Sequence, residues 1–304
     1  MTIPLRGWFS ALVRRESLSP AWEYRVRGVI WRLLPTERGQ FVGEERDIEG
    51  KAVSFFCVRQ DTGALQWGNL RLREPWWIGI EAVHNDLVLL HQYAVPDFPD
   101  HKKIHALDLS TGRLLWSNED FKYLFAYGDN IYCSGELPDG PLYVELDSMS
   151  GRQNRELDAQ EVNALRRTIQ YREPVDFPVP FLNSEGDHVD VGGTIEKLVA
   201  GERRIQFIEF LQRNEFLAVA YYAAIGNDSD KLPGEPLAEP LMNQHFIIAE
   251  GRTGRVLFKE VLNSRASAAV PDSFFSLGDM LYSIAGKNVL KAFNLASSGL
   301  PNSD

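Results

Sequence analysis

Cysteine is scarce in this sequence. Its 304 residues contain two, Cys57 and Cys133, and no Cys-x-x-Cys pair. The two fall on predicted strands that are far apart in the sequence, and buried, reduced thiols are expected. Long apolar runs are lacking as well, because the run at Trp8–Val13 is too short and too interrupted for a signal peptide or a membrane span. We expect residues 1–16 to form a tail and the chain to act in the cytoplasm.

Positive charge is in deficit. There are 32 Lys and Arg residues against 42 Asp and Glu residues, which gives a formal net charge of −10. Nucleic acids and anionic membrane surfaces attract proteins through positive potential. We therefore expect no nucleic-acid partner and no anionic-membrane partner, and the short apolar run predicts no membrane span. Apolar residues make up 44% and charged residues 24% of the chain, which indicates a globular protein rather than a disordered one.

What the sequence does contain is a repeated strand–turn–strand unit, clearest at Ile104–Trp116 (IHALDLSTGRLLW). Asp, Ser, Thr and Gly at 108–112 are turn-forming residues, and Gly112 can adopt positive φ. The apolar runs on both sides are typical of strands. Looser copies stand at Cys57–Trp67, Glu145–Gly151, Ile248–Phe258 and Lys291–Gly299. The last copy stops at its turn, before a second strand begins.

The missing strand is found near the N-terminus, where Ser19–Gly28 resembles the segment that follows a Thr-Gly turn, with Trp22 at the Trp position. We infer that this strand completes the last repeat and closes a ring, which leaves no long exposed sheet edge. A second turn signal precedes the copies and predicts hairpins at 38–40, 85–86, 128–130, 214–215 and 278–279. Four strands per repeat, at a spacing of about 45 residues, predict an all-β fold: a β-propeller of four-stranded blades.

The repeat pattern breaks at about 156–203. Asp158–Gln170 predicts a helix, with its first residue as the N-cap and three apolar residues on one face. The proline-rich stretch Glu173–Pro180 is unsuitable for a central strand. We favour five blades with an insertion at about 156–203, in a single domain over 17–304. Six blades with one degenerate blade, whose hairpin would lie at Gly186–Asp187, is the alternative.

The segment Ala106–Trp116 (ALDLSTGRLLW) resembles the PQQ-like, or quinoprotein-type, propeller repeat. The resemblance covers about Trp22–Gly299, closely in two copies and loosely in three. The whole chain also resembles an uncharacterised bacterial domain-of-unknown-function family. These resemblances imply a fold and no activity. Enzymes with this repeat carry a quinone, Ca²⁺ and an adjacent Cys-Cys pair, and since this sequence has no Cys-Cys pair and no calcium motif that we can match, we expect no cofactor.

Few residues suggest catalysis. Five-bladed glycosidases place two carboxylates in the central channel, and on the predicted inner strands only Glu81 and Glu209 are acidic. His91 lies before a proline-containing loop and His101 and His105 follow it, but histidines four apart suit a metal site on a helix rather than a loop. We predict no metal site and no catalytic residue. A non-catalytic binding or interaction module is favoured over an enzyme, with a glycoside-acting enzyme as the alternative.

Binding residues of propellers tend to lie on the loops between the second and third strands and on the links between blades. Here those loops are acidic with interspersed aromatic residues, which suits a protein or peptide partner that carries basic residues. The loop 226–244 is expected to be the main contact element. The predicted partner-binding residues are Trp76, Asp97, Phe98, Asp100, Asp228, Asp230 and Glu235.

Overall fold

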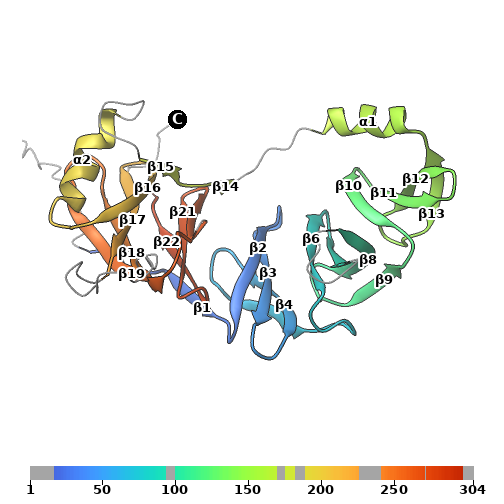
Figure 1. The fold of residues 1–304 in the computed structure, drawn as a ribbon, viewed down its shortest axis with the longest axis horizontal. Coiled ribbons are helices and arrows are strands. Elements are labelled where there is room, and N and C mark those ends of the chain that lie inside the picture. The colour runs from blue at the N-terminus through green and yellow to red at the C-terminus, as the bar shows by residue number, and fades with distance from the viewer. Residues whose placement is uncertain are drawn as a thin grey trace, which may run out of the picture. The chain divides into compact units, whose positions relative to one another are not determined.

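The structure is a computed structural model that describes residues 17–93, 100–169, 175–181, 189–225, 241–270 and 272–296. Within these residues the strands form five antiparallel sheets, three with four strands and two with five. Figure 1 shows the sheets following one another along the chain. This is the blade architecture that the repeats predict, so the all-β propeller fold class is confirmed.

The chain divides into two compact units, which are described separately. The first unit comprises residues 22–173 and 287–289 and contains blades one to three. Blade one consists of β2 (Val29–Pro35), β3 (Gln40–Asp47), β4 (Ala52–Arg59) and β5 (Leu65–Leu70). Blade two consists of β6 (Ile78–His84), β7 (Leu87–Tyr93), β8 (His101–Asp108) and β9 (Leu114–Asn118). Blade three consists of β10 (Lys122–Tyr127), β11 (Asn130–Leu137), β12 (Gly140–Asp147) and β13 (Gln153–Leu157).

The second unit comprises the rest of the chain, including residues 174–286. Blade four consists of β16 (Ile205–Arg213), β17 (Phe216–Ala224), β18 (Met242–Glu250) and β19 (Val256–Ala266). Blade five consists of β20 (Phe274–Leu277), β21 (Met280–Ala285) and β22 (Val289–Asn294), and its outer strand is β1 (Trp22–Arg25), whose residues are counted with the first unit. The N-terminal strand therefore completes the C-terminal sheet, as the sequence predicts.

One contact explains why Trp and Gly recur in the repeats of the first unit. The indole Nε1 of Trp67, on β5, donates to the carbonyl oxygen of Leu109 at 2.8 Å, and the indole lies over the turn of the next blade at Gly112. A Cβ on Gly112, which has φ +70°, would lie 2.9 Å from the Trp67 ring. Trp116 repeats the contact at Ser148 and Gly151, and Trp22 of β1 repeats it at Gln60 and Gly63.

The insertion adds two helices and two short strands. Helix α1 (Ala159–Thr168) begins after the N-cap Asp158, whose carboxylate accepts from the backbone N–H groups of Gln160 and Glu161. This confirms the helix predicted from 158. Strands β14 (Val175–Asp176) and β15 (Val179–Pro180) pair with β20 and β16 respectively. Each therefore adds a short fifth strand at the edge of its sheet. An edge position suits Pro180 of β15, because proline has no backbone N–H to donate.

Helix α2 (Val189–Val199) stands where a sixth blade would need a strand, so five blades account for the described residues. Its Thr194 takes the place that Trp has elsewhere. Thr194 Oγ1 donates to the carbonyl oxygen of Gly251 at 3.1 Å, and its Cγ2 would lie 3.4 Å from a Cβ on Gly254. In each case the carbonyl acceptor is three residues before the turn glycine, as Leu109 is before Gly112.

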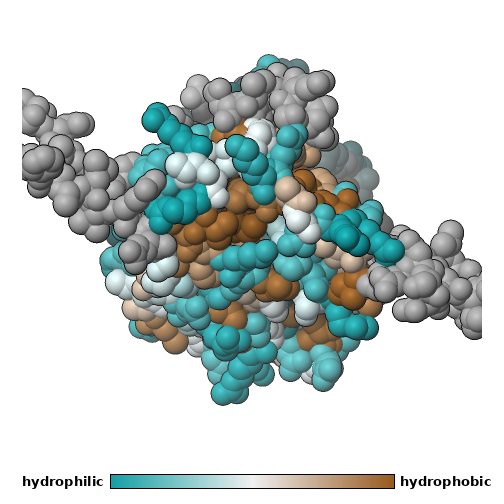
Figure 2. Space-filling view, turned by 90° about the vertical axis from the view of Figure 1, so that its left-hand side faces the viewer, coloured by the Kyte–Doolittle hydropathy of each residue, from teal (hydrophilic) through white to brown (hydrophobic). Residues whose placement is uncertain are grey.

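Apolar side chains remain exposed on the outer strands of blades in both units. In the first unit, Leu114 and Leu115 of β9 are exposed, and in the second, Val256 and Val261 of β19 are exposed. Figure 2 shows the side of the second unit, where apolar and polar residues alternate around an apolar band. Because outer-strand exposure recurs from blade to blade, it does not by itself mark a binding site.

Two further expectations can be compared with the structure. Cys57 on β4 and Cys133 on β11 are buried and unpaired, as predicted. Neither helix among the described residues combines the length and apolar character that crossing a membrane requires.

Candidate functional site at the loop end of blade two

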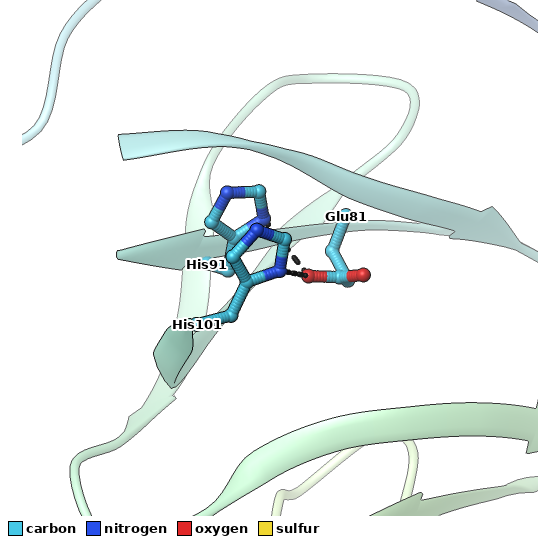
Figure 3. A group of neighbouring side chains, drawn as sticks. All are labelled: Glu81, His91 and His101. Atoms are coloured by element: carbon cyan, nitrogen blue, oxygen red, sulfur yellow. Dashed lines mark hydrogen bonds and ion pairs between the residues drawn. The ribbon is translucent and has the colours of Figure 1, made fainter. Parts of the chain in front are cut away.

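Three ligand-type side chains meet on three neighbouring strands of blade two. Glu81 lies on β6, His91 on β7 and His101 on β8. The Nδ1 atom of His101 lies 2.8 Å from Glu81 Oε2, and the Nδ1 atom of His91 lies 2.8 Å from the same oxygen. Figure 3 shows both imidazoles directed at this one carboxylate oxygen. Their ring planes are stacked, with centroids 3.5 Å apart and an interplanar angle of 6°.

Two β-bulges bring these residues together. Ile80 pairs with Leu90 and Ala82 with Leu89, so Glu81 is the extra residue of a bulge in β6. A second irregularity interrupts the pairing of β7 with β8 beside His91, and Lys103 on β8 has φ +58°. A bulge bends its strand and changes the direction of the side chains around it. The alternation of an unbroken strand therefore does not predict where these side chains point.

His91 is buried with one of its ring nitrogens unsatisfied. Its side chain is 4% exposed, and its Nε2 atom has no hydrogen-bond partner among the described residues. Its Nδ1 atom is the one that lies 2.8 Å from Glu81 Oε2. Burying a polar atom without a partner costs about 1–3 kcal/mol. Gly79, the cross-strand partner of His91, provides the space, because a Cβ there would lie 3.3 Å from His91 Cε1.

Charge at the site is set by burial and by neighbouring groups. Burial raises the pKa of the Glu81 carboxyl, but the adjacent His91 and His101 outweigh it, and the net pKa is lowered. Burial lowers the pKa of the His91 imidazole, and the charge of His101 lowers it further against the opposing effect of Glu81. At neutral pH the arrangement therefore presents an ionised carboxylate beside a neutral buried imidazole.

Aromatic rings surround the two histidines. Tyr93 makes edge contacts with His91 and His101, at centroid distances of 5.1 and 5.4 Å. Trp77 makes an edge contact with Tyr93 at 6.0 Å, and Trp76 one with Trp77 at 6.4 Å. Both tryptophans precede β6 rather than lying within it, and they contact each other.

A second aromatic feature joins blade one to this end of blade two. The Arg46 guanidinium lies 5.1 Å from the ring centroid of Trp31 and 4.9 Å from that of Trp76. Arg46 is itself held by Glu44 Oε1 at 2.6 Å and by the carbonyl oxygen of Ile78 at 3.0 Å. Trp31 is the bulge residue of β2 and is 58% exposed. A buried, fixed cation thus lies between an exposed indole and a half-buried one.

Two of the seven predicted partner-binding residues fall within the described chain. Trp76 belongs to the aromatic group just described, and Asp100, just before β8, forms an ion pair with Lys122 of blade three at 3.0 Å. Asp97, Phe98, Asp228, Asp230 and Glu235 lie outside the described residues. The loop 226–244, expected to be the main contact element, is described only from 241 onwards.

The two inner-strand carboxylates each have partners within their own blade. Glu81 contacts His91 and His101, as above. Glu209 of β16 is buried, and its Oε1 lies 3.4 Å from Gln244 Nε2 of β18. Burial, together with the charge of Asp272, raises the pKa of Glu209 to about 7. Each carboxylate therefore already contacts a side chain of its own blade. A glycosidase, by contrast, uses two free carboxylates that flank the sugar.

Comparison with known proteins finds one partial match to a sequence family model. Residues 34–116 match the family model described as "Domain of unknown function (DUF4905)". The matched range includes Glu81, His91 and His101. No curated protein matches the chain.

Three solved structures illustrate what the fold is similar to. BamB from Moraxella catarrhalis is 11% identical over 92% of this chain and 87% of that chain, with a TM-score of 0.34. A europium-containing methanol dehydrogenase is 10% identical over 89% of this chain, which spans about half (52%) of that protein, with a TM-score of 0.31. An uncharacterized protein from Listeria monocytogenes EGD-e is 8% identical over 91% and 97% of the two chains, with a TM-score of 0.32. With TM-scores below 0.5, these likenesses carry no argument about activity.

Proposed function

We propose that this chain is a non-catalytic binding module that recognises a protein or peptide at the loop end of blades one and two. We call this region the loop-end surface and define it by Trp31, Lys51, Trp76, Trp77, Tyr93 and Asp100. The proposal extends the prediction made from the loops, and it keeps Trp76 and Asp100 as contact residues.

The observation that carries the proposal is the exposed indole of Trp31, held against Arg46. Trp, Tyr and Arg are the residues that most often dominate interface energies, and they do so where they are held in place before binding. Arg46 is fixed by Glu44 and by two carbonyl oxygens, so it positions the Trp31 and Trp76 rings without needing a ligand. The Nζ atom of Lys51 also lies over the Trp76 ring, 4.7 Å from its centroid.

Other observations support a binding role over glycoside hydrolysis. Glu81 and Glu209 have partners within their own blades, as described above. The net charge of −10 favours a partner with basic residues and disfavours a nucleic acid. Both cysteines are unpaired, which supports our expectation that the protein acts in the reducing cytoplasm.

The test is a comparison of two variants that each remove one exposed apolar side chain. Trp31→Ala removes the side chain that is 58% exposed at the loop-end surface, and Leu114→Ala removes one that is 53% exposed on the outer strand β9. Partners captured from the native host by wild-type protein are identified, and binding of the purified partner to each variant is then measured by calorimetry. We expect Trp31→Ala to weaken binding by about 2 kcal/mol, roughly 30-fold in Kd, and Leu114→Ala to leave it unchanged.

Equal affinity of the wild type and Trp31→Ala for every captured partner would remove the loop-end surface as the contact. The enzyme alternative is measured in parallel with a panel of chromogenic glycosides. Turnover by the wild type that disappears in Glu209→Gln, in a protein that remains folded, would replace the binding proposal with a glycosidase.

A further inference from the structure

We propose that Glu81, His91 and His101 form a binding site for a first-row divalent transition metal ion, of which Zn²⁺ is the representative. The inference goes beyond the proposed binding function and does not rest on it, because metal binding can be measured without any partner. Two imidazoles and one carboxylate are a recurrent ligand set of zinc and of non-haem iron in proteins.

The ligand atoms already lie at the spacing that a metal requires. One donor atom from each of the three residues lies within 4.8 Å of the others. Ligands at about 2.0–2.2 Å from a tetrahedral zinc are roughly 3.4 Å apart. Each Nδ1 atom is 2.8 Å from Glu81 Oε2, so movements of about half an ångström would admit the ion. Three protein ligands would leave a fourth position for water or another donor.

The buried imidazole of His91 is the second observation that points to a ligand. Its side chain is 4% exposed, its Nδ1 atom faces Glu81 Oε2 at 2.8 Å, and its Nε2 atom has no hydrogen-bond partner among the described residues. His105, the neighbouring buried histidine on β8, shows the contrast. Its Nδ1 lies 2.8 Å from Ser117 Oγ and its Nε2 lies 3.0 Å from Gln92 Nε2, so both of its ring nitrogens are satisfied by the protein.

Blade three shows that the blade can be built without these residues. Its inner strand has a bulge at Leu124, between the pairs Tyr123–Cys133 and Phe125–Tyr132. Leu124 therefore corresponds to Glu81, and Ser134, paired with Lys122, corresponds to His91, paired with Gly79. The same scaffold carries an apolar residue and a hydroxyl at the matching positions. The requirements of the sheet therefore do not account for a carboxylate and two stacked imidazoles in blade two.

The chemistry of the set selects the class of ion. Imidazole nitrogen suits Zn²⁺, Co²⁺, Ni²⁺ and Cu²⁺, whereas Mg²⁺ and Ca²⁺ prefer sets made of oxygen atoms. Glu81 supplies a carboxylate oxygen, and His91 and His101 each supply an imidazole nitrogen. Tyr93 makes edge contacts with both histidines, and Trp77 makes an edge contact with Tyr93.

The experiment titrates Zn²⁺ and Co²⁺ into untagged, chelator-treated full-length protein. Zinc is followed by calorimetry, and cobalt by its visible absorption, which reports coordination geometry. The test variants are Glu81→Gln and His101→Gln, whose side chains are 17% and 33% exposed and therefore less critical to folding than His91. The matched control is His105→Gln. Circular dichroism verifies that each variant is folded.

We expect one equivalent of each ion to bind the wild type and His105→Gln. Loss of a direct ligand should weaken binding by about 100-fold or more in Glu81→Gln and in His101→Gln, because even outer-shell changes cost roughly 10–100-fold. Absence of stoichiometric binding by the wild type, or equal binding by His101→Gln, would overturn the inference. So would an equal loss in His105→Gln.

Discussion

Trp22 offers the sharpest test of how the N-terminal strand completes the fold. It is 9% exposed, and its Nε1 donates to the carbonyl oxygen of Gln60 at 3.0 Å. Its ring would lie 2.5 Å from a Cβ on Gly63, so indole and turn are in close contact. A Trp side chain buries roughly 150–250 Å², or about 4–6 kcal/mol at about 25 cal/mol per Å². Measured losses for Trp→Ala in cores are about 3–5 kcal/mol.

We therefore predict that Trp22→Ala lowers the free energy of unfolding by about 3–5 kcal/mol. Trp22→Phe keeps an aromatic ring but removes the donor, and should cost about 1 kcal/mol. The matched variant is Trp116→Ala, since Trp116 makes the same contacts between consecutive blades, with Nε1 2.9 Å from Ser148 O. The assay is urea unfolding followed by far-UV circular dichroism. A loss below about 1 kcal/mol in Trp22→Ala, with the full loss in Trp116→Ala, would refute the idea that β1 functions as a blade strand.

Three further predictions concern stability. Deleting residues 1–28, which removes β1, should unfold the protein, whereas deleting residues 1–15 should leave the melting curve unchanged. If the protein without residues 1–28 melts like the full chain, β1 is not needed to complete blade five. Gly112→Ala should cost about 2 kcal/mol or more, measured by urea unfolding, because φ is +70° and the new Cβ would lie 2.9 Å from the Trp67 ring. Because the pKa of Glu209 is raised from about 4.5 to about 7, the folded protein binds the proton more tightly than the unfolded chain does, and stability falls as pH rises from about 4.5 to 7. As pH rises over this range, the free energy of unfolding of Glu209→Gln should increase relative to that of the wild type by up to about 3 kcal/mol. Parallel pH profiles of unfolding free energy for the two proteins would show that the pKa of Glu209 is not raised.

The repeat was predictable from sequence because one physical contact maintains it. Trp67 and Gly112 must be Trp and Gly for the indole to lie on a turn of positive φ, so both remain visible in the pattern. The same contact identifies Trp22 as part of the last blade, although β1 ends at Arg25 and β22 begins only at Val289. The helix at α1 was also predictable, because its N-cap Asp158 precedes an amphipathic segment.

Helix α2 was not predicted from sequence. Its residues (VDVGGTIEKLV) include two adjacent glycines and several β-branched residues, which are poor helix formers. Tertiary contacts determine the outcome, since Val191 and Ile195 are buried against β16 and β17. The Thr194 contact with the turn at Gly251 could not be recognised in advance either, because it replaces an indole with a hydroxyl.

The sequence predicts the residues of the site separately but not their convergence. It places Glu81 on an inner strand, and His91 and His101 on either side of a loop. Their convergence depends on the bulge at Glu81 and on the irregular pairing beside His91, and neither has a sequence signal of its own. One signal was available: three successive strands of one blade carry a carboxylate and two histidines, Glu81, His91 and His101. A search for ligand types across paired strands would have found it.

The functional site at the loop end of blade two is tested most directly by anomalous diffraction from crystals grown with Zn²⁺. Data collected on both sides of the zinc absorption edge locate the ion independently of any assay. The prediction is a single strong anomalous peak bounded by Glu81, His91 and His101, at about 2.0–2.2 Å from one donor atom of each. Zinc peaks elsewhere on the protein, with none between these three side chains, would contradict it.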